Sequence, residues 1–228
     1  MSLLPADPKV RAVLERLHAQ SAAQDPELAG YFGRRARAGD LDWRALDEDA
    51  HRFMADKMVA LEPDKAAFCA QVCRALRART VVEVGSSYGV STIHLADAVR
   101  EVVVAEGGAG KVVATEYEPP KCAAARGHWA EAGLADLIDL REGDLRETLK
   151  DLQGPIDFVL MDIWTEMARP AIELIGPHLR PGAVVIADNT TQFAKAYTDY
   201  FAYLNDPANR LRTQTLPFAG GLEFTVRV

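Results

Sequence analysis

The chain has 228 residues, of which 49% are hydrophobic and 26% are charged, and its formal net charge is −7. This composition is ordinary for a globular protein with a real core, and the length suits one large α/β domain. The acidic balance argues against nucleic-acid or anionic-membrane partners, which need clustered Lys and Arg. No run of about 18 apolar residues predicts a transmembrane helix, and the N-terminus becomes charged too early for a signal peptide. Three cysteines are too few for a disulfide framework, so a cytoplasmic enzyme is expected.

Residues 1–60 carry helical patterns, with apolar residues at three- and four-residue spacing. We expect them to form a helical extension or cap, followed by a single domain over residues 61–228. No internal repeat or Pro-rich linker divides that domain. The segments predicted to be helical here and just beyond are Pro8–Ala19, Pro26–Ala38, Trp43–Leu61 and Asp64–Leu76.

After Arg79, short β-branched runs alternate with helical stretches. Near-continuous apolar strands separated by helices indicate a parallel sheet covered on both faces, and right-handed crossovers make it doubly wound. Two strands with only PFAGG between them end the chain and predict an antiparallel hairpin at one sheet edge. The predicted strands are TVVEV, KVVATEY, LIDLREGD, IDFVLMD, AVVIADN, RLRTQTL and LEFTVRV, with later helices near Glu166–Leu179 and Gln192–Leu204.

A glycine-containing loop, Glu83–Gly89, follows the first predicted strand and opens a helix, so a ligand is expected at the carboxyl end of that strand. A dinucleotide site would need G-x-G-x-x-G, but the second and third positions here are Ser87 and Val90, and no basic residue is nearby for a pyrophosphate. A ligand without phosphates fits better. S-adenosylmethionine is such a ligand, because backbone N–H groups and Ser hydroxyls can hold its carboxylate while Glu83 faces its amine indirectly.

Two further acidic residues follow the next two predicted strands. Glu116 ends VVATE, where a carboxylate can accept hydrogen bonds from both hydroxyls of a ribose. Asp144, in EGD after the third strand, could meet the adenine amino group. Each signal has an ordinary alternative, since glycine is common in tight turns and Glu116 could be a solvated charge. Their occurrence after three successive strands favours one cofactor site.

Oxygen-bearing side chains also follow the fourth and fifth predicted strands, namely Asp162 in VLMD and Asp188 with Asn189 in VVIADN. Neighbouring parallel strands would bring them to one edge of the sheet, as a hard oxygen set suited to Mg²⁺ or Ca²⁺. Such an ion would bind vicinal hydroxyls and lower their pKa. Helix capping is the alternative for all three residues, for example before a helix near Gln192.

The chain resembles the catechol O-methyltransferase-like family in six motifs: VVEVGSSYGVST, VVATEYEPPKCAAARGHWAEAG, LREGDLRETL, IDFVLMDIW, LRPGAVVIADN and LPFAGGLEF. These are class I, cation-dependent enzymes that methylate hydroxyls of small molecules. The resemblance runs from about Leu61 to Val228. It implies a Rossmann-like, seven-stranded sheet with an antiparallel last strand, a divalent cation such as Mg²⁺, and a homodimer.

The resemblance also gives roles to matching residues. It implies that Met58–Lys65 closes over the methionine part of the cofactor and that Trp164 flanks the cofactor. Asp162, Asp188 and Asn189 would be the metal ligands, with Asp162 as the candidate catalytic residue. Together with the loop analysis, the predicted cofactor-binding residues are Glu83, Gly85, Ser86, Tyr88, Gly89, Ser91, Glu116, Asp144, Asp162 and Trp164.

One residue departs from the family pattern. The family usually has a lysine as general base three residues after the first metal-binding aspartate, and this chain has Thr165 there. A threonine hydroxyl is too weak an acid–base group to replace an ammonium near neutral pH. Three alternatives remain: metal activation alone, another base such as Lys195 or Glu166, or an acceptor that needs no base.

The leading hypothesis is transfer of a methyl group from S-adenosylmethionine to a hydroxyl of a small, catechol-like molecule, by in-line displacement in a water-poor pocket. A metal-independent N- or O-methyltransferase, an NAD-type oxidoreductase and a non-catalytic adenosylmethionine-binding protein are the alternatives. The N-terminal helices, Thr190–Tyr197 and the Pro217–Gly221 turn are expected to select the acceptor. Candidate pocket walls, which could instead be helix-packing residues, are Tyr31, Phe32, Trp43 and Phe193.

Overall fold

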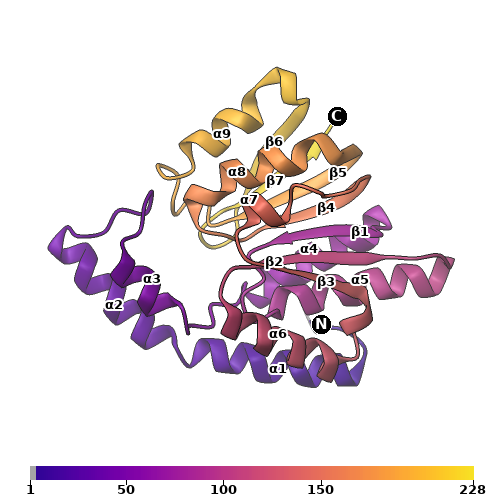
Figure 1. Ribbon diagram of the computed structural model, residues 1–228, viewed down its shortest axis with the longest axis horizontal. Helices are drawn as coiled ribbons and strands as arrows, with labels where there is room; N and C mark the ends of the chain where they lie inside the picture. Colours follow the sequence, from indigo (N-terminus) through magenta and orange to yellow (C-terminus); the bar gives the residue numbers. More distant parts are fainter. Residues whose placement is uncertain (1–3) are drawn as a thin grey trace.

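The computed structural model describes residues 4–228, so residues 1–3 of the predicted N-terminal extension lie outside the described residues. A seven-stranded sheet in the order β3-β2-β1-β4-β5-β7-β6 forms its centre (Figure 1). Neighbouring strands are parallel except at β7, which is antiparallel to both β5 and β6. The predicted Rossmann-like sheet with an antiparallel last strand is therefore confirmed. The strands are Thr80–Val84 (β1), Lys111–Glu116 (β2), Ile138–Glu142 (β3), Ile156–Met161 (β4), Leu179–Asp188 (β5), Leu211–Leu216 (β6) and Leu222–Arg227 (β7).

Helices cover both faces of the sheet, because side chains alternate between the two faces along each strand and both faces are apolar. In β1, Val81 belongs to a core cluster with residues of α1, α4, α5 and α6, whereas Val82 belongs to a second cluster with residues of α7, α8 and α9. Figure 1 shows helices on both sides of the sheet. No described helix is long and apolar enough to cross a membrane. The α-helices are Pro8–Ala22 (α1), Asp25–Ala38 (α2), Glu48–Met54 (α3), Pro63–Leu76 (α4), Val90–Glu106 (α5), Pro119–Ala132 (α6), Leu145–Thr148 (α7), Thr165–Ile175 (α8) and Thr198–Asn205 (α9), with 3₁₀ turns at Ala135–Leu137, Gly176–His178 and Pro207–Asn209.

The first helix belongs to the body of the molecule. It buries Val10, Leu14 and Leu17 and packs against α5 and α6. By contrast, α2 contains no buried residue, and α2 and α3 project from the body as a lobe (Figure 1). The predicted N-terminal extension is thus divided between a packed helix and a projecting pair, which we call the α2–α3 lobe.

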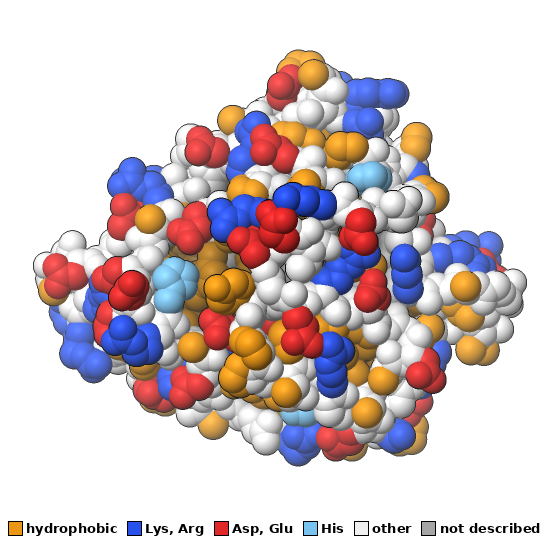
Figure 2. Space-filling view, viewed as in Figure 1, with side chains coloured by type: hydrophobic (Ala, Val, Ile, Leu, Met, Phe, Trp, Pro, Cys, Tyr) orange, Lys and Arg blue, Asp and Glu red, His pale blue; other side chains and the backbone are white. Residues whose placement is uncertain are grey.

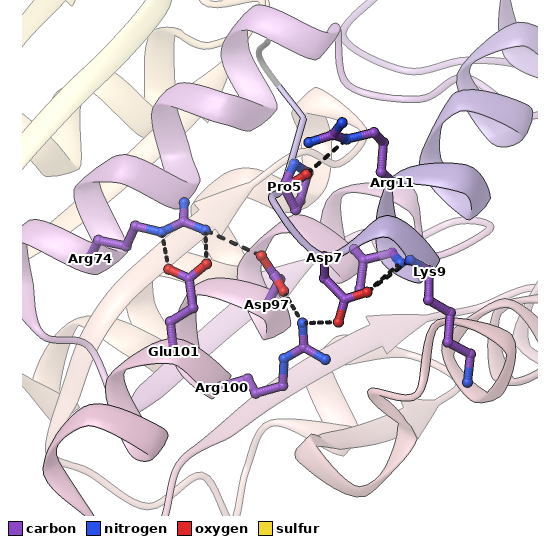
Figure 3. A network of polar contacts seen from close by, with 9 residues as sticks. Pro5, Asp7, Lys9, Arg11, Arg74, Asp97, Arg100 and Glu101 are labelled. Atoms are coloured by element: carbon purple, nitrogen blue, oxygen red, sulfur yellow. Dashed lines mark hydrogen bonds and ion pairs between the residues drawn. The ribbon is translucent and has the colours of Figure 1, made fainter.

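A network of charged side chains fixes the start of α1 (Figure 3). Arg100 of α5 contacts Asp7, which caps α1, at 2.9 Å, and it also contacts Asp97 at 2.5 Å. Arg74 of α4 contacts Asp97 at 3.2 Å and Glu101 at 2.5 Å. Because these charges alternate in sign across three helices, they hold α1 in one position against α4 and α5.

The prediction of helix throughout Trp43–Leu61 was wrong. Only α3 is helical there, because Asp47 accepts a hydrogen bond from the N–H of Ala50 at 2.9 Å and so caps a helix that begins at Glu48. Residues 55–62, which we call the covering segment, are not helical. Their backbone is bonded to distant parts of the chain instead.

The helix predicted near Gln192–Leu204 begins later than its apolar spacing indicated, at Thr198. The N–H groups of Thr191 and Gln192 both donate to the carbonyl oxygen of Gly220 at 2.9 Å. This pairing with the β6–β7 turn holds residues 190–197 in turns, because tertiary hydrogen bonds take the place of helical ones.

Candidate functional site

The carboxyl ends of four neighbouring strands bring most of the predicted site residues to one edge of the sheet. Val84, which ends β1, is paired with Thr115 of β2 and with Met161 of β4. Met161 is paired in turn with Ala187 of β5. On this side of the molecule Figure 2 shows a recess between the α2–α3 lobe and the body, with hydrophobic side chains inside it and charges of both signs around it. The residues that directly follow these paired positions are Gly85, Glu116, Asp162 and Asp188.

The two glycines of the loop are required by close contacts. Gly85 has a φ of +91°, and a Cβ there would lie 2.1 Å from the carbonyl oxygen of Asp162. Gly89 has a φ of +79°, and a Cβ there would lie 2.3 Å from Nε1 of Trp129. That indole nitrogen donates to the carbonyl oxygen of Gly89 at 3.0 Å. The loop is therefore clamped between β4 and α6, which leaves its remaining N–H groups and hydroxyls in a fixed position.

A narrow pocket lies between this loop and the covering segment. Met58 and Leu61 are buried there. Ser21 of α1 donates to the carbonyl oxygen of Met58 at 3.0 Å, and Oε1 of Gln24 accepts from the Met58 N–H at 3.0 Å. The Tyr88 hydroxyl donates to the Asp56 carbonyl oxygen at 2.9 Å. The residues lining the pocket are Met58, Val59, Ala60, Leu61, Gly85, Ser86, Ser87, Tyr88, Val90, Ser91 and Asp162.

Two polar side chains are buried at the loop. Oγ of Ser86, a pocket residue, has no hydrogen-bond partner within the described structure. Glu83 is fully buried behind the loop and accepts from the hydroxyl of Thr92. Burial raises the pKa of Glu83 to about 7. Hydrogen bonds from the hydroxyls of Ser91 and Thr92 lower this pKa, but their effect is smaller than that of burial. An unpaired buried hydroxyl is costly, so Ser86 fits a site for a polar ligand.

The carboxylate of Glu116 connects β2 to the glycine loop. One of its oxygens accepts from the N–H of Ser87 at 2.8 Å, and the other accepts from the N–H groups of Tyr117 and Glu118, both at 2.8 Å. A carboxylate oxygen has two lone pairs, so the side chain retains capacity for a ligand hydroxyl. Glu116 is therefore not the freely solvated charge of the alternative interpretation.

Asp144 has a structural partner. Its side chain caps α7 by accepting from the N–H of Arg146 at 2.9 Å, and it contacts the Arg146 guanidinium at 2.6 Å. These hydrogen bonds lower the pKa of Asp144. It is not among the pocket-lining residues, so its role towards an adenine stays a prediction. Trp164 also lies outside the pocket, where its ring meets that of His51 edge to face at 5.6 Å between centroids.

At the other end of the edge, Asp188 is buried and has two partners. Nζ of Lys65 lies 2.6 Å from its Oδ1, and Nδ2 of Asn189 donates to its Oδ2 at 2.9 Å. Lys65 also contacts Glu62 at 2.9 Å. Burial alone would lower the pKa of Lys65, but the two carboxylates outweigh it and raise that pKa, so the side chain is an ammonium. Burial, followed by the Asp188 charge, raises the pKa of Asp162.

These three residues do not fit a divalent cation as they are arranged. Both oxygens of Asp188 are already in contact with nitrogen atoms: Oδ1 forms an ion pair with Lys65, and Oδ2 accepts a hydrogen bond from the Asn189 amide. No group of three or more His, Cys, Asp or Glu within residues 4–228 is arranged to hold a metal. The capping alternative is also not seen, since the residues before α8 and α9 are Trp164 and Tyr197. Metal binding here stays a prediction.

Thr165, in the position of the expected lysine, attaches the N-terminal segment to the site. Its hydroxyl donates to the carbonyl oxygen of Trp43 at 2.5 Å. The Trp43 ring packs on Phe193 with centroids 4.5 Å apart. Lys195 and Glu166, the alternative bases, are both exposed. The predicted wall residues Trp43 and Phe193 are therefore in contact with each other, and their role towards an acceptor stays a prediction.

Lys65 was not predicted from the sequence as a partner of Asp188 and Glu62. A signal was present, because Lys65, Cys69 and Cys73 recur at four-residue spacing and all three are buried in α4. A lysine on the buried stripe of an amphipathic helix needs an acidic partner. Ser21 and Gln24 were also missed, because their contacts with the covering segment depend on how α1 packs.

Comparisons with known proteins agree with this geometry. Residues 82–190 match the profile of a methyltransferase-domain family. The catechol O-methyltransferase of Mycobacterium tuberculosis is 33% identical over 132 residues, which are 58% of this chain and 57% of that protein. That of Niastella koreensis is 27% identical over 145 residues, or 60% of this chain and 61% of that protein. The matches thus span about three fifths of the length of these relatives.

Solved structures extend the likeness over nearly the whole chain. An O-methyltransferase from Bacillus cereus, crystallised in complex with SAH, superposes with a TM-score of 0.68 and 20% identity. The superposition covers 98% of this chain and 93% of that one. At this level of identity the likeness establishes the fold, including the N-terminal helices.

Proposed function

This chain contains a methyltransferase domain related to the catechol O-methyltransferases, and from that premise we propose that it transfers a methyl group from S-adenosylmethionine to a hydroxyl of a small molecule. The observation that carries the proposal is the glycine loop at the carboxyl end of β1. Its glycines are held in close backbone contact on both sides, and the buried Ser86 hydroxyl lines its pocket without a partner. A loop of this kind suits a carboxylate and an amine better than a pyrophosphate.

The cofactor, when bound, supplies an electrophilic methyl group on sulfur. Ser86, with the loop N–H groups, would hold its carboxylate, and Glu116 would accept hydrogen bonds from its ribose. The buried Glu83 would face its amine indirectly. Met58 and Leu61 of the covering segment exclude water from the pocket, which favours direct transfer over hydrolysis.

The acceptor we propose is a small aromatic molecule with a hydroxyl, of which a catechol is one example. Trp43 and Phe193, together with Trp164, would present flat apolar surfaces to it. Thr165 is committed to the Trp43 carbonyl oxygen and is not a base, so the chain would align the hydroxyl oxygen with the methyl group, while the hydroxyl proton passes to water and the cofactor leaves as its thioether, S-adenosylhomocysteine. A divalent cation forms no part of this proposal, because Asp188 and Asn189 do not fit one.

We further propose that the segment up to residue 60 acts as a cap on the acceptor side of a domain beginning at residue 61. The α2–α3 lobe and the contacts of Trp43 support this division. A homodimer and a cytoplasmic location stay predictions, which light scattering and fractionation of the producing cells would test.

Calorimetric titration with S-adenosylmethionine tests cofactor binding. We expect saturable binding that weakens about tenfold or more in Glu116→Gln, because a charge-assisted hydrogen bond is lost and the loop N–H groups lose an acceptor. Glu147→Gln, on the exposed side of α7, is the control and should bind like the parent chain. Binding of NAD in place of S-adenosylmethionine would reject the proposal.

Methyl transfer itself is tested with labelled S-adenosylmethionine and a panel of phenols, catechols and aliphatic alcohols. We expect methylated product with aromatic hydroxyls. Cofactor binding without product from any oxygen or nitrogen acceptor would instead favour a non-catalytic binding protein. Product from amines alone would favour an N-methyltransferase.

A further inference from the structure

The Lys65 side chain is fully buried at the acceptor edge of the site. Its Nζ lies 2.6 Å from Asp188 and 2.9 Å from Glu62. A buried ammonium is tolerated only where carboxylates or other acceptors surround it. Lys65 is placed by the first turn of α4, directly after the covering segment, so the fold holds a cation against the end of β5.

The Lys65 ammonium already places a positive charge beside these carboxylates, as a metal ion bound there would. The carboxylates near this point are Asp162, Asp188 and Glu62; beyond burial, the charges of Asp188 and Glu62 contribute to the raised pKa of Asp162, and the charge of Glu62 contributes to that of Asp188. Without a cation, the buried Asp188 would be repelled by the neighbouring Asp162 and, more weakly, by Glu62, whose side chain is half exposed. Lys65 lies among them and faces the Oδ1 of Asp188, an oxygen that a metal would need to take.

We propose that the Lys65 ammonium takes the place of a divalent cation in this site, so that the chain neutralises Asp188 and orders the acceptor edge without metal. The part concerning the acceptor rests on the proposed function, whereas the part concerning the cation is a property of the ligand-free chain. Lys65 acts through Asp188 and is therefore a positioning residue.

A consequence for the acceptor follows. A metal ion binds two vicinal oxygens at once, and this is the physical basis of a requirement for catechols. An ammonium already held by two carboxylates offers no such double coordination. An acceptor with one hydroxyl should thus be methylated as well as its vicinal diol counterpart.

Binding of Mn²⁺, followed by the paramagnetic resonance signal of the free ion, tests the claim directly. The parent chain should show no saturable site up to millimolar Mn²⁺. Lys65→Met retains an unbranched side chain without the charge, and we expect it to gain one Mn²⁺ site, at least about tenfold tighter than any binding by the parent chain. Adding Asp188→Asn to this variant should remove the new site. Lys57→Met, which removes a lysine of the covering segment whose ion pairs are with Asp56 and Glu27 and not with Asp188, is the matched control and should gain no Mn²⁺ site.

Two outcomes would overturn the inference: a single Mn²⁺ site in the parent chain that weakens in Asp188→Asn, or a folded Lys65→Met that gains no site. If Lys65→Met does not fold, the parent titration and Lys65→Arg decide, since the retained charge should keep Mn²⁺ out.

The proposed function fails separately, through absence of S-adenosylmethionine binding, and this would leave the Mn²⁺ result unaffected. Conversely, methyl transfer that is abolished by EDTA and restored by Mg²⁺ would reject the role of Lys65 while supporting methyl transfer. Turnover that continues at the same rate in EDTA, with equal rates for a phenol and its catechol, is the expected result.

Discussion

Gly85 shows how strongly one residue can be constrained by its neighbours. Its φ of +91° is in a region that favours glycine, and its α-carbon faces the backbone of the loop after β4. The neighbouring atom is the carbonyl oxygen of Asp162, which cannot turn aside as a flexible side chain could. The glycine thus sets the distance between the glycine loop and the backbone that follows β4.

Gly85→Ala should destabilise the protein by at least about 2 kcal/mol, because it combines a strained φ with a backbone clash. Chemical denaturation measures the loss. Gly127→Ala is the control: a Cβ there has open space in the middle of α6, so the substitution should stabilise by about 0.5–1 kcal/mol. Equal stability of the two variants would contradict the close contact at Gly85.

At the scale of elements, the candidate site is surrounded by segments that are neither regular helix nor strand. The covering segment is held by α1 and by Tyr88, and residues 190–197 are held by the β6–β7 turn. Trp43 is held by the first residue of α8. Three irregular segments are therefore positioned by hydrogen bonds to residues far from them in the sequence.

The attachment of Trp43 is testable through Thr165. Thr165→Val keeps the side-chain shape but removes the donor, and the loss of one hydrogen bond should weaken docking of the segment around Trp43 by about 1 kcal/mol. Faster amide hydrogen exchange in residues 41–47, with α4 and α5 unchanged, is the expected readout. Thr165→Ser keeps the hydroxyl and should exchange like the parent chain. No difference between the two variants would show that the hydroxyl does not hold this segment.

At the scale of the whole molecule, the sheet could be predicted because each parallel strand is apolar on both faces. Helix boundaries were less predictable where long-range contacts intervene. No pattern within Trp43–Leu61 indicates that the Met58 backbone forms hydrogen bonds with Ser21 and Gln24 instead of the local hydrogen bonds of a helix. The apolar spacing after Gln192 likewise continues through residues whose N–H groups bond to Gly220.

In the candidate site, too, features set by single strands could be predicted from the sequence, whereas features set by long-range packing could not. The glycine loop, Glu116 and Asp162 could be located because strand ends are visible in a sequence. The partner of Asp188 could not, since Lys65 lies 123 positions earlier and reaches it only once α4 has packed beside β5. Residue types alone suggested a metal set, and the position of one lysine changes that interpretation.

The packing of α1 on α5 makes stability depend on pH. His94 is buried and its Nε2 lies 3.3 Å from that of His18. Burial lowers the pKa of His94 to about 3 and also lowers that of His18. At these two histidines the unfolded chain therefore binds more protons than the folded chain below about pH 6.5, so their contribution to stability is lost as pH falls from there towards 3.

His94→Gln removes one of these protonation sites. Between pH 7 and pH 5 the parent chain should lose about 2 kcal/mol more unfolding free energy than the variant does, as denaturation at both pH values would show. Parallel loss in the two proteins would mean that His94 stays uncharged in the unfolded chain or is hydrated in the folded one.

The backbone of Met58 is hydrogen-bonded to Ser21 and Gln24, so if S-adenosylmethionine binds in the pocket as proposed, residues outside the sheet take part in controlling its exchange. A ligand as large as S-adenosylmethionine has to pass residues 58–61, so its residence time would depend on how often those bonds open. Ser21→Ala, which removes the hydroxyl bonded to Met58 and Ala60 and leaves the packed face of α1 in place, should keep the cofactor's contacts yet release the product sooner. Natural variation in α1 would then adjust the duration of each catalytic cycle without altering any residue that touches the ligand.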